Sequence, residues 1–239
     1  LGNSSSWGLN IISLSMPEME VRRYGEENTG ETFRAGSYAI GTTWAANLTD
    51  RFSIGFNGKY IREFISRSAA SGLALDVGTL FNTVYGPTLG MSISNFGPKM
   101  QINGADLLIN VDDVSNNSKI NADLSTEKFN LPLTMRFGIS HTQNGEDVQV
   151  LWAVDAVSPM DNSEYLNLGV ELEFLNKIYI RGGGKSIFIS EREEIFTLGG
   201  GLKLELFSKQ ILQINYAYEA MQYLNDIHTF SISVTRRAY

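Results

Sequence analysis

The stretch Phe52-Ser-Ile-Gly-Phe-Asn-Gly-Lys-Tyr60 puts its large apolar side chains on alternate positions and sets Asn57 and Lys59 between them. Because successive side chains of a strand point to opposite faces, this period of two predicts a strand with one apolar and one polar face. The same alternation recurs in Leu133-Thr-Met-Arg-Phe-Gly-Ile139 and in Tyr165-Leu-Asn-Leu-Gly-Val-Glu-Leu-Glu-Phe174. Helical periodicity appears nowhere over a useful length, so the chain is predicted to be all-β.

Working outward from these stretches gives about twelve predicted strands of roughly ten residues each. They cover residues 7–16, 36–48, 51–64, 71–85, 88–97, 131–142, 147–157, 164–174, 177–189, 194–207, 210–220 and 226–237. Strands of soluble proteins average about five or six residues. Longer strands with one wholly apolar face are typical of a transmembrane antiparallel β-barrel.

The connections between the predicted strands alternate in length. Tight turns are predicted at Thr49-Asp50, Gly86-Pro87, Gln143–Glu146, Asn176 and Ser208-Lys209. Longer loops are predicted at Pro17–Ala35, Ile65–Ala70, Pro98–Asn130, Ser158–Ser163, Ser190–Glu193 and Met221–Asn225. Short turns on one rim and long loops on the other is the outer-membrane pattern, so Pro17–Ala35 and Pro98–Asn130 should share the extracellular rim.

The alternation also assigns side chains to faces. The outward, apolar face should carry Tyr38, Ile40, Trp44, Phe52, Ile54, Phe56, Leu73, Leu75, Val77, Met135, Phe137, Val150, Trp152, Leu168, Val170, Leu172, Leu198, Leu202, Leu204, Leu212, Ile214 and Tyr216. The inward face should carry Lys59, Glu63, Asp76, Arg136, Asp155, Glu171, Glu173, Arg181, Lys185, Lys203, Glu205 and Glu219. So many charges cannot form a dry core, because an unpaired buried ion costs several kcal/mol. They fit a watered or salt-bridged lumen, or, in a soluble sandwich, the solvent face.

Composition narrows the function. The 239 residues carry a formal net charge of −7, which argues against nucleic acid, and include no cysteine. The sequence contains no run of 18 apolar residues, so no transmembrane helix is predicted. No signal peptide is visible at Leu1. The sequence therefore predicts a single outer-membrane β-barrel domain over residues 1–239, from which the N-terminal part of the barrel is missing.

Catalytic and cofactor motifs are weak. Arg181-Gly-Gly-Gly-Lys-Ser186 superficially resembles a phosphate loop, but it lacks the first glycine and continues as a strand, whose small inward residues would make room for lumen contents. His141 and His228 have no metal-ligating residues at a suitable spacing. No Gly-x-Ser-x-Gly elbow is present. We therefore predict no enzymatic activity, no cofactor and no metal.

The segment Pro98–Asn130 is the most suggestive loop, because loops of this length are usually functional or disordered. It is too apolar for pure disorder. It could fold back as a lid over the lumen or dock a partner. The candidate partner-binding residues are Met100, Ile102, Leu107, Leu108, Ile109 and Val111.

The order of several segments resembles the PorV/PorQ family of outer-membrane barrels, which is related in fold to the FadL transporters. The resembling segments include Ala39-Ile-Gly-Thr-Thr-Trp-Ala-Ala-Asn-Leu-Thr-Asp-Arg-Phe-Ser-Ile-Gly55, Ala70-Ser-Gly-Leu-Ala-Leu-Asp-Val-Gly-Thr-Leu80, Ser92-Ile-Ser-Asn-Phe-Gly97, Val154-Asp-Ala-Val-Ser-Pro-Met-Asp-Asn162 and Asn215-Tyr-Ala-Tyr218. The resemblance implies a non-enzymatic barrel of fourteen strands in the intact protein. It also implies the bacterial outer membrane, with lipid and lipopolysaccharide around the wall.

For function, the PorV resemblance implies an accessory or shuttle of type IX secretion or surface attachment in Bacteroidota. The implied partners are a SprA-like translocon and the C-terminal domains of secreted cargo. The alternative is a FadL-like passive transporter of hydrophobic small molecules. A transporter should have a continuous apolar tunnel, and because the inward face is rich in charge, the sequence favours secretion.

Overall fold

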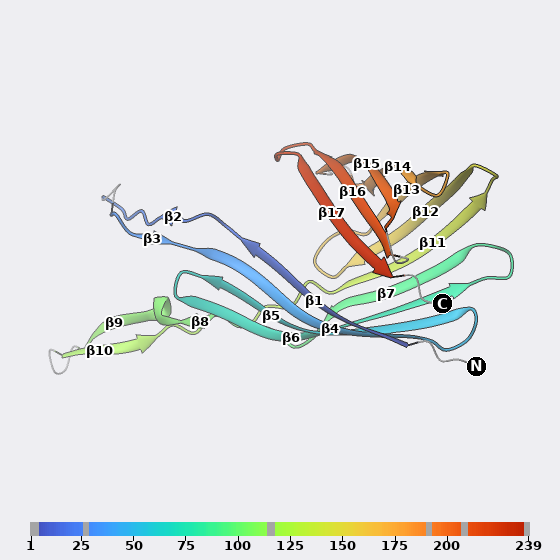
Figure 1. Ribbon diagram of the computed structural model, residues 1–239. Helices are drawn as coiled ribbons and strands as arrows, with labels where there is room; N and C mark the ends of the chain where they lie inside the picture. The colour runs from blue at the N-terminus through green and yellow to red at the C-terminus, as the bar shows by residue number, and fades with distance from the viewer. Residues whose placement is uncertain (1–4, 26–28, 114–117, 190–192, 207–209, 237–239) are drawn as a thin grey trace. The chain divides into compact units, whose positions relative to one another are not determined.

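A computed structural model describes residues 5–25, 29–113, 118–189, 193–206 and 210–236 of the chain (Figure 1). The twelve long strands are β1 (Ser5–Ser15), β4 (Ala35–Asn47), β5 (Phe52–Ile65), β6 (Ser68–Asn82), β7 (Thr88–Phe96), β11 (Thr134–Asn144), β12 (Val148–Pro159), β13 (Tyr165–Phe174), β14 (Ile178–Ile187), β15 (Glu194–Glu205), β16 (Gln210–Met221) and β17 (Ile227–Arg236). All twelve strands predicted from the alternation are present, which confirms the all-β prediction. Their ends agree with the prediction to within three residues.

Hydrogen bonding orders the long strands β1-β4-β5-β6-β7-β11-β12-β13-β14-β15-β16-β17. The pairing of β1 with β4 and the successive pairings from β11 to β17 are antiparallel. Five short strands lie in the connections: β2 (Met19–Glu20), β3 (Thr32–Phe33), β8 (Asn103–Gly104), β9 (Leu108–Asp113) and β10 (Ser118–Asp123). The one described helix is the 3-10 turn η1 (Ala105–Leu107). Among the described residues, no helix has the length and apolar character needed to cross a membrane.

The residue contacts divide the chain into two compact units. The first contains Leu1–Leu48, Ile54–Gly78 and Ile93–Leu133. The second contains Thr49–Ser53, Thr79–Ser92 and Thr134–Tyr239. Strands β5, β6 and β7 each contribute residues to both units.

In the first unit, the two long connections meet at the same end of the strands, as predicted. The turn between β5 and β6 joins both: the Ser66 N–H donates to the Arg34 carbonyl (2.9 Å), and Arg67 pairs with Asp106 (2.9 Å). Figure 1 shows β2–β3 and β9–β10 projecting beyond that end. The predicted longer loop Ile65–Ala70 is wrong, because β5 and β6 are separated only by Ser66 and Arg67. Ser66 makes this tight reversal with a positive φ of 53°.

The base of the Pro98–Asn130 segment packs against the sheet of the first unit. Main-chain hydrogen bonds of 2.9 Å join Met100 and Phe129 in both directions. Met100 is 1% exposed and lies among Ala70, Ala74 and Leu131. A side chain at Gly72 would meet Met100 at 2.8 Å, so the missing Cβ leaves room for this close approach. The segment is therefore not a simple loop, since it carries a small core at its base and the hairpin β9–β10 at its tip.

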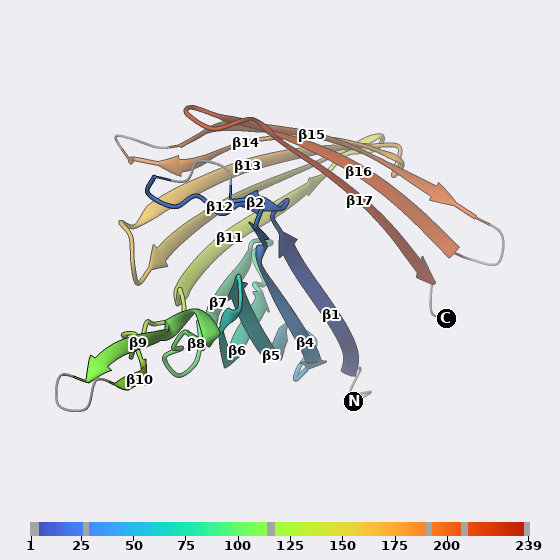
Figure 2. The same cartoon turned by 90° about the vertical axis from the view of Figure 1, so that its left-hand side faces the viewer.

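In the second unit, β11 to β17 follow one another as a curved layer (Figure 2). Leu175 and Asn176 connect β13 to β14 with positive φ values of 52° and 56°. Two positive values match the right-handed twist of a tight hairpin. The predicted turn Ser208-Lys209 and residues 190–192 of the predicted loop Ser190–Glu193 lie outside the described residues.

Within the second unit, large apolar side chains on the face opposite the charged one are exposed. Val170 is 50% exposed, Leu198 54% and Ile214 41%, although each points away from the charged face. A soluble sandwich buries this kind of face against another sheet. The exposed apolar face of these strands therefore favours lipid as their surroundings.

Candidate functional site

A hollow of about 500 Å³ lies on the polar face of the second unit, across strands β12 to β17. Its side chains come from alternate positions of the strands, and they include Glu171 and Arg181, which the sequence assigns to the inward face. The lining residues of that face are Leu151, Ala153, Gly169, Glu171, Arg181, Gly183, Thr197, Gly199, Asn215, Ala217, Thr229 and Ser231. Volumes of roughly 300–1,000 Å³ are typical of small-molecule sites.

The register of the strands collects these residues into rows that run across the sheet. One row pairs Ala153 with Gly169, Gly169 with Gly183, and Gly183 with Thr197. Every member is small, so the hollow exists because no side chain fills the space above this row. The next row runs Leu151, Glu171, Arg181, Gly199, Ala217, Thr229 in consecutive pairs.

Arg181 is the central charge of the hollow, and its partners are on neighbouring strands. Its Nε donates to the Glu171 carboxylate, which stands directly opposite on β13. Its Nη1 donates to Asn215 Oδ1 at 2.9 Å. The guanidinium also lies over the Tyr179 ring, 5.1 Å from the centroid. The positive charge is therefore compensated within the wall.

Asn215 extends this chain of contacts toward the last strand. Its Nδ2 donates to Ser231 Oγ at 3.2 Å. Elsewhere on the same polar face, Lys185 pairs with Glu219 at 2.6 Å. Pairing of opposite charges on one face supports the inward assignment of Glu171, Arg181, Lys185 and Glu219.

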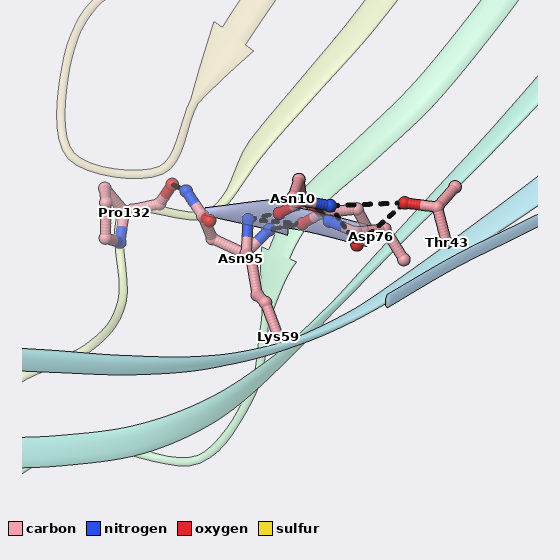
Figure 3. A network of polar contacts seen from close by, with 7 residues as sticks. Asn10, Thr43, Lys59, Asp76, Asn95 and Pro132 are labelled. Carbon is pink, nitrogen blue, oxygen red and sulfur yellow. Dashed lines mark hydrogen bonds and ion pairs between the residues drawn. The ribbon is translucent and has the colours of Figure 1, made fainter. Parts of the chain in front are cut away.

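The polar face of the first unit holds a separate network centred on Asp76 (Figure 3). Lys59 Nζ lies 2.8 Å from one carboxylate oxygen, and Asn57 Nδ2 donates to the other at 2.9 Å. The Asn95 main-chain N–H also donates to Asp76, at 2.7 Å. Asn95 is held there with a φ of 64°, in the left-handed region that asparagine tolerates better than most residues.

Further contacts spread this network across the strands. Asn10 Nδ2 donates to Asn57 Oδ1 at 3.0 Å, and the Thr43 hydroxyl donates to the same oxygen at 3.0 Å. Asn95 Nδ2 donates to the Pro132 carbonyl at 2.9 Å. Asp76 on β6 thus contacts β5 and β7 directly. Through Asn57 the network reaches β1 and β4, and through Asn95 it reaches Pro132, just before β11. The network therefore holds neighbouring strands of the first unit together, and we assign it a structural role.

The candidate partner-binding residues divide into two groups. Met100 is buried in the base core and Ile102 packs partly against it, so the expectation that Met100 is available to a partner is corrected. Leu107 is half-buried, whereas Leu108 (56%) and Ile109 (40%) are exposed on the hairpin. The Val111 side chain lies outside the described residues.

The hairpin begins next to an ionic anchor. Asp106 accepts the Arg67 main-chain N–H at 2.7 Å and its guanidinium Nε–H at 2.9 Å. These contacts, the main-chain bond first, hold the pKa of Asp106 below its ordinary value. Gly104 precedes the helical turn with a φ of 152°, and a Cβ there would lie 2.5 Å from the Arg67 carbonyl, so the close pairing of β8 with β6 requires glycine.

Metal-binding geometry is not found in the described part of the chain, where no three His, Cys, Asp or Glu side chains gather. His141 instead packs near Trp152, with ring centroids 6.0 Å apart. His228 contacts Tyr216, whose hydroxyl lies 2.8 Å from His228 Nδ1.

Comparison with known proteins shows which solved structures share this fold. No protein-family model and no curated protein matches the sequence. The solved structures it resembles are FadL-type channels. The Pseudomonas putida toluene transporter TodX gives a TM-score of 0.56 at 9% identity, over 95% of this chain and 76% of that one. A Pseudomonas aeruginosa FadL homologue gives 0.52 at 10% identity, over 91% and 67%.

A third structure, the CymD monoaromatic hydrocarbon channel, gives a TM-score of 0.52 at 11% identity, over 97% of this chain and 85% of that one. Identities this low establish likeness of fold alone. The fold is therefore similar to that of FadL-type barrels, and the finer PorV/PorQ resemblance stays a prediction.

Proposed function

We propose that the chain is an outer-membrane channel for small hydrophobic molecules, without enzymatic activity. The observation that carries the proposal is the hollow of about 500 Å³ on the polar face of the second unit, floored by Gly169, Gly183 and Thr197. The fold is similar to that of a toluene transporter and of a monoaromatic hydrocarbon channel, which supports this reading over secretion.

The charges of the inward face do not oppose transport of apolar molecules. From the sequence they favoured secretion, because a charged wall seemed unsuited to hydrocarbon. In the structure, the two charged residues that line the hollow, Glu171 and Arg181, pair with each other, and Lys185 pairs with Glu219 on the same face. A paired charge leaves little net field on a neighbouring ligand, so an apolar molecule can lie beside it.

Uptake by cells tests the proposal. A Gram-negative host lacking its own hydrocarbon channel, when it expresses this chain, is expected to take up radiolabelled toluene several-fold faster than the same host with an empty vector. A radiolabelled neutral trisaccharide serves as the control solute, and its uptake should not change. Toluene uptake equal to that of the empty vector, with the chain assembled in the outer membrane, would refute the channel.

A second candidate function is an accessory role in type IX secretion, and the exposed apolar side chains at the start of the hairpin β9–β10 favour it. Leu108 and Ile109 present exposed apolar side chains at the base of the hairpin β9–β10, next to the Arg67–Asp106 anchor. Exposed apolar side chains at such a site are typical of partner contacts. On this reading, the hairpin contacts a SprA-like translocon or the C-terminal domain of secreted cargo.

Replacing Leu108 and Ile109 together by Thr keeps β-propensity while removing the apolar contact. If the hairpin docks cargo, binding of a purified cargo C-terminal domain should weaken at least about tenfold in biolayer interferometry. Met160→Thr, at an exposed site on the second unit, is the matched control. Point changes are preferable to deleting Ala105–Val111, which would also remove the Asp106 anchor. Unchanged cargo binding by the double variant would exclude the hairpin as the docking site.

A further inference from the structure

Arg181 in the hollow already has hydrogen-bonding and ionic partners among the neighbouring side chains of the sheet. Glu171 neutralises the Arg181 guanidinium, Asn215 accepts a second hydrogen bond from it, and the Tyr179 ring lies beneath it. Asn215 is itself bonded to Ser231, and the Thr197 hydroxyl donates to the Gly183 carbonyl at 3.4 Å. The polar groups around the hollow are thus bonded mainly to one another.

This pairing decides which ligands fit. An anionic ligand would have to compete with Glu171 for Arg181, and it would lie next to the Glu171 carboxylate, which repels it. An uncharged apolar ligand leaves the pair intact and covers the small-residue floor. The arrangement therefore accommodates neutral hydrophobes and disfavours carboxylates, which could reach Arg181 only by displacing Glu171.

We propose that Glu171 makes the hollow selective for uncharged hydrophobic ligands, because it occupies Arg181 and so excludes ligands that carry a carboxylate. The inference rests on the proposed channel function and names its substrate class. Size supports the assignment, because an apolar cavity of about 150 Å³ already holds benzene. The hollow, at about 500 Å³, has room for a substituted ring.

The charge part of the proposal is tested with Glu171→Gln. The variant removes the carboxylate charge but keeps a hydrogen-bond acceptor of the same shape for Arg181. In detergent-solubilised protein, ligand-observed NMR should show that the wild type binds toluene and hardly binds benzoate at neutral pH. In the variant, benzoate affinity should rise at least about tenfold relative to toluene affinity.

Glu219→Gln is the matched control, because it removes the same charge from the same face outside the hollow. It should leave both affinities as in the wild type. Benzoate binding to the wild type as tightly as toluene, or an unchanged benzoate affinity in Glu171→Gln, would overturn the role of Glu171. A rise of the same size in Glu219→Gln would also overturn it, since the effect would then be one of general charge.

The position of the site is tested with Gly169→Leu. A Cβ at Gly169 meets no atom within 4 Å, so the new side chain extends into the hollow without a backbone clash. Toluene affinity should fall at least about tenfold. Gly200→Leu is the control, because Gly200 lies on the apolar face, where its nearest contact would be the Tyr179 carbonyl at 3.7 Å. Assembly of both variants is checked by heat-modifiable gel mobility.

The outcomes separate this inference from the channel proposal. Toluene binding that Gly169→Leu abolishes, without toluene uptake by cells, would sustain the binding site and refute the channel. Uptake that continues unchanged in Gly169→Leu would sustain the channel and refute this site.

Discussion

Ile214→Lys is expected to leave most of the chain unassembled in lipid vesicles. Ile214 lies near the middle of β16, on the apolar face, with 41% of its surface exposed. A cation at mid-depth on the lipid face of a barrel costs about 2–4 kcal/mol. That cost is a large fraction of the stability of an ordinary fold. Heat-modifiable gel mobility after refolding would report the assembled fraction.

Gln213→Lys provides the matched comparison for Ile214→Lys. The same ammonium group is introduced one residue earlier, and it points to the opposite face, where charged side chains already stand. The loss is limited to the hydrogen bond from Gln213 to Asn215 (3.2 Å), so assembly should remain close to wild type. Equal assembly of the two lysine variants would show that the apolar face does not contact lipid.

Asp76→Ala is expected to destabilise the protein by about 3 kcal/mol, because it leaves a largely buried cation without its partner. The side chains of Lys59 and Asp76 are 15% and 23% exposed. The Asn57 amide and the Asn95 main-chain N–H lose the same acceptor. Urea-induced unfolding in detergent micelles, followed by tryptophan fluorescence, would measure the change in the free energy of unfolding.

A double-mutant cycle isolates the ionic part of this effect. Lys59→Met alone should cost less than Asp76→Ala, because Asp76 keeps two other donors. In Lys59→Met/Asp76→Ala, the second change should cost about 1 kcal/mol less than it does alone, since no buried cation is left unpaired. Strictly additive effects would mean that the pair is solvated and contributes little.

The strands and their two faces could be predicted from the sequence because both depend on local rules. Side-chain alternation fixes which face each residue occupies once a strand is recognised. For that reason the sequence places Glu171 and Arg181 on the inward face without any knowledge of strand pairing. The tight turn at Asn176 was equally visible, since asparagine tolerates the positive φ that it adopts there.

The hollow itself could not be predicted, because it depends on register between strands. Arg181 stands opposite Glu171 and Gly199 only if β13, β14 and β15 pair as they do. The β13–β14 pairing contains an irregularity between Leu166 and Leu168, and the sequence gives no local sign of it. The glycines of Arg181-Gly-Gly-Gly-Lys-Ser186 were a usable signal, since small inward residues leave space.

The Pro98–Asn130 segment was predicted incompletely for a different reason. Its apolar residues were read as one group, but tertiary packing separates them. Met100 lies in the base core, where Gly72 leaves room for it, while Leu108 reaches the exposed hairpin. Composition alone cannot distinguish an apolar residue that packs at the base of a segment from one that stays exposed on its hairpin.

The rows of the hollow have a consequence for how this sequence can diverge. A Cβ at Gly183 would meet the Leu168 carbonyl at 2.7 Å and the Thr197 hydroxyl at 3.2 Å, and both residues are far from Gly183 along the chain but lie beside it across the sheet. An enlargement at one member of a row can be accommodated by shrinking another member of that row, but not by changing a sequence neighbour, which faces lipid. Compensating substitutions among homologues should therefore occur in pairs of residues that are distant in sequence but face each other on adjacent strands. The ligand range of the hollow would then evolve row by row.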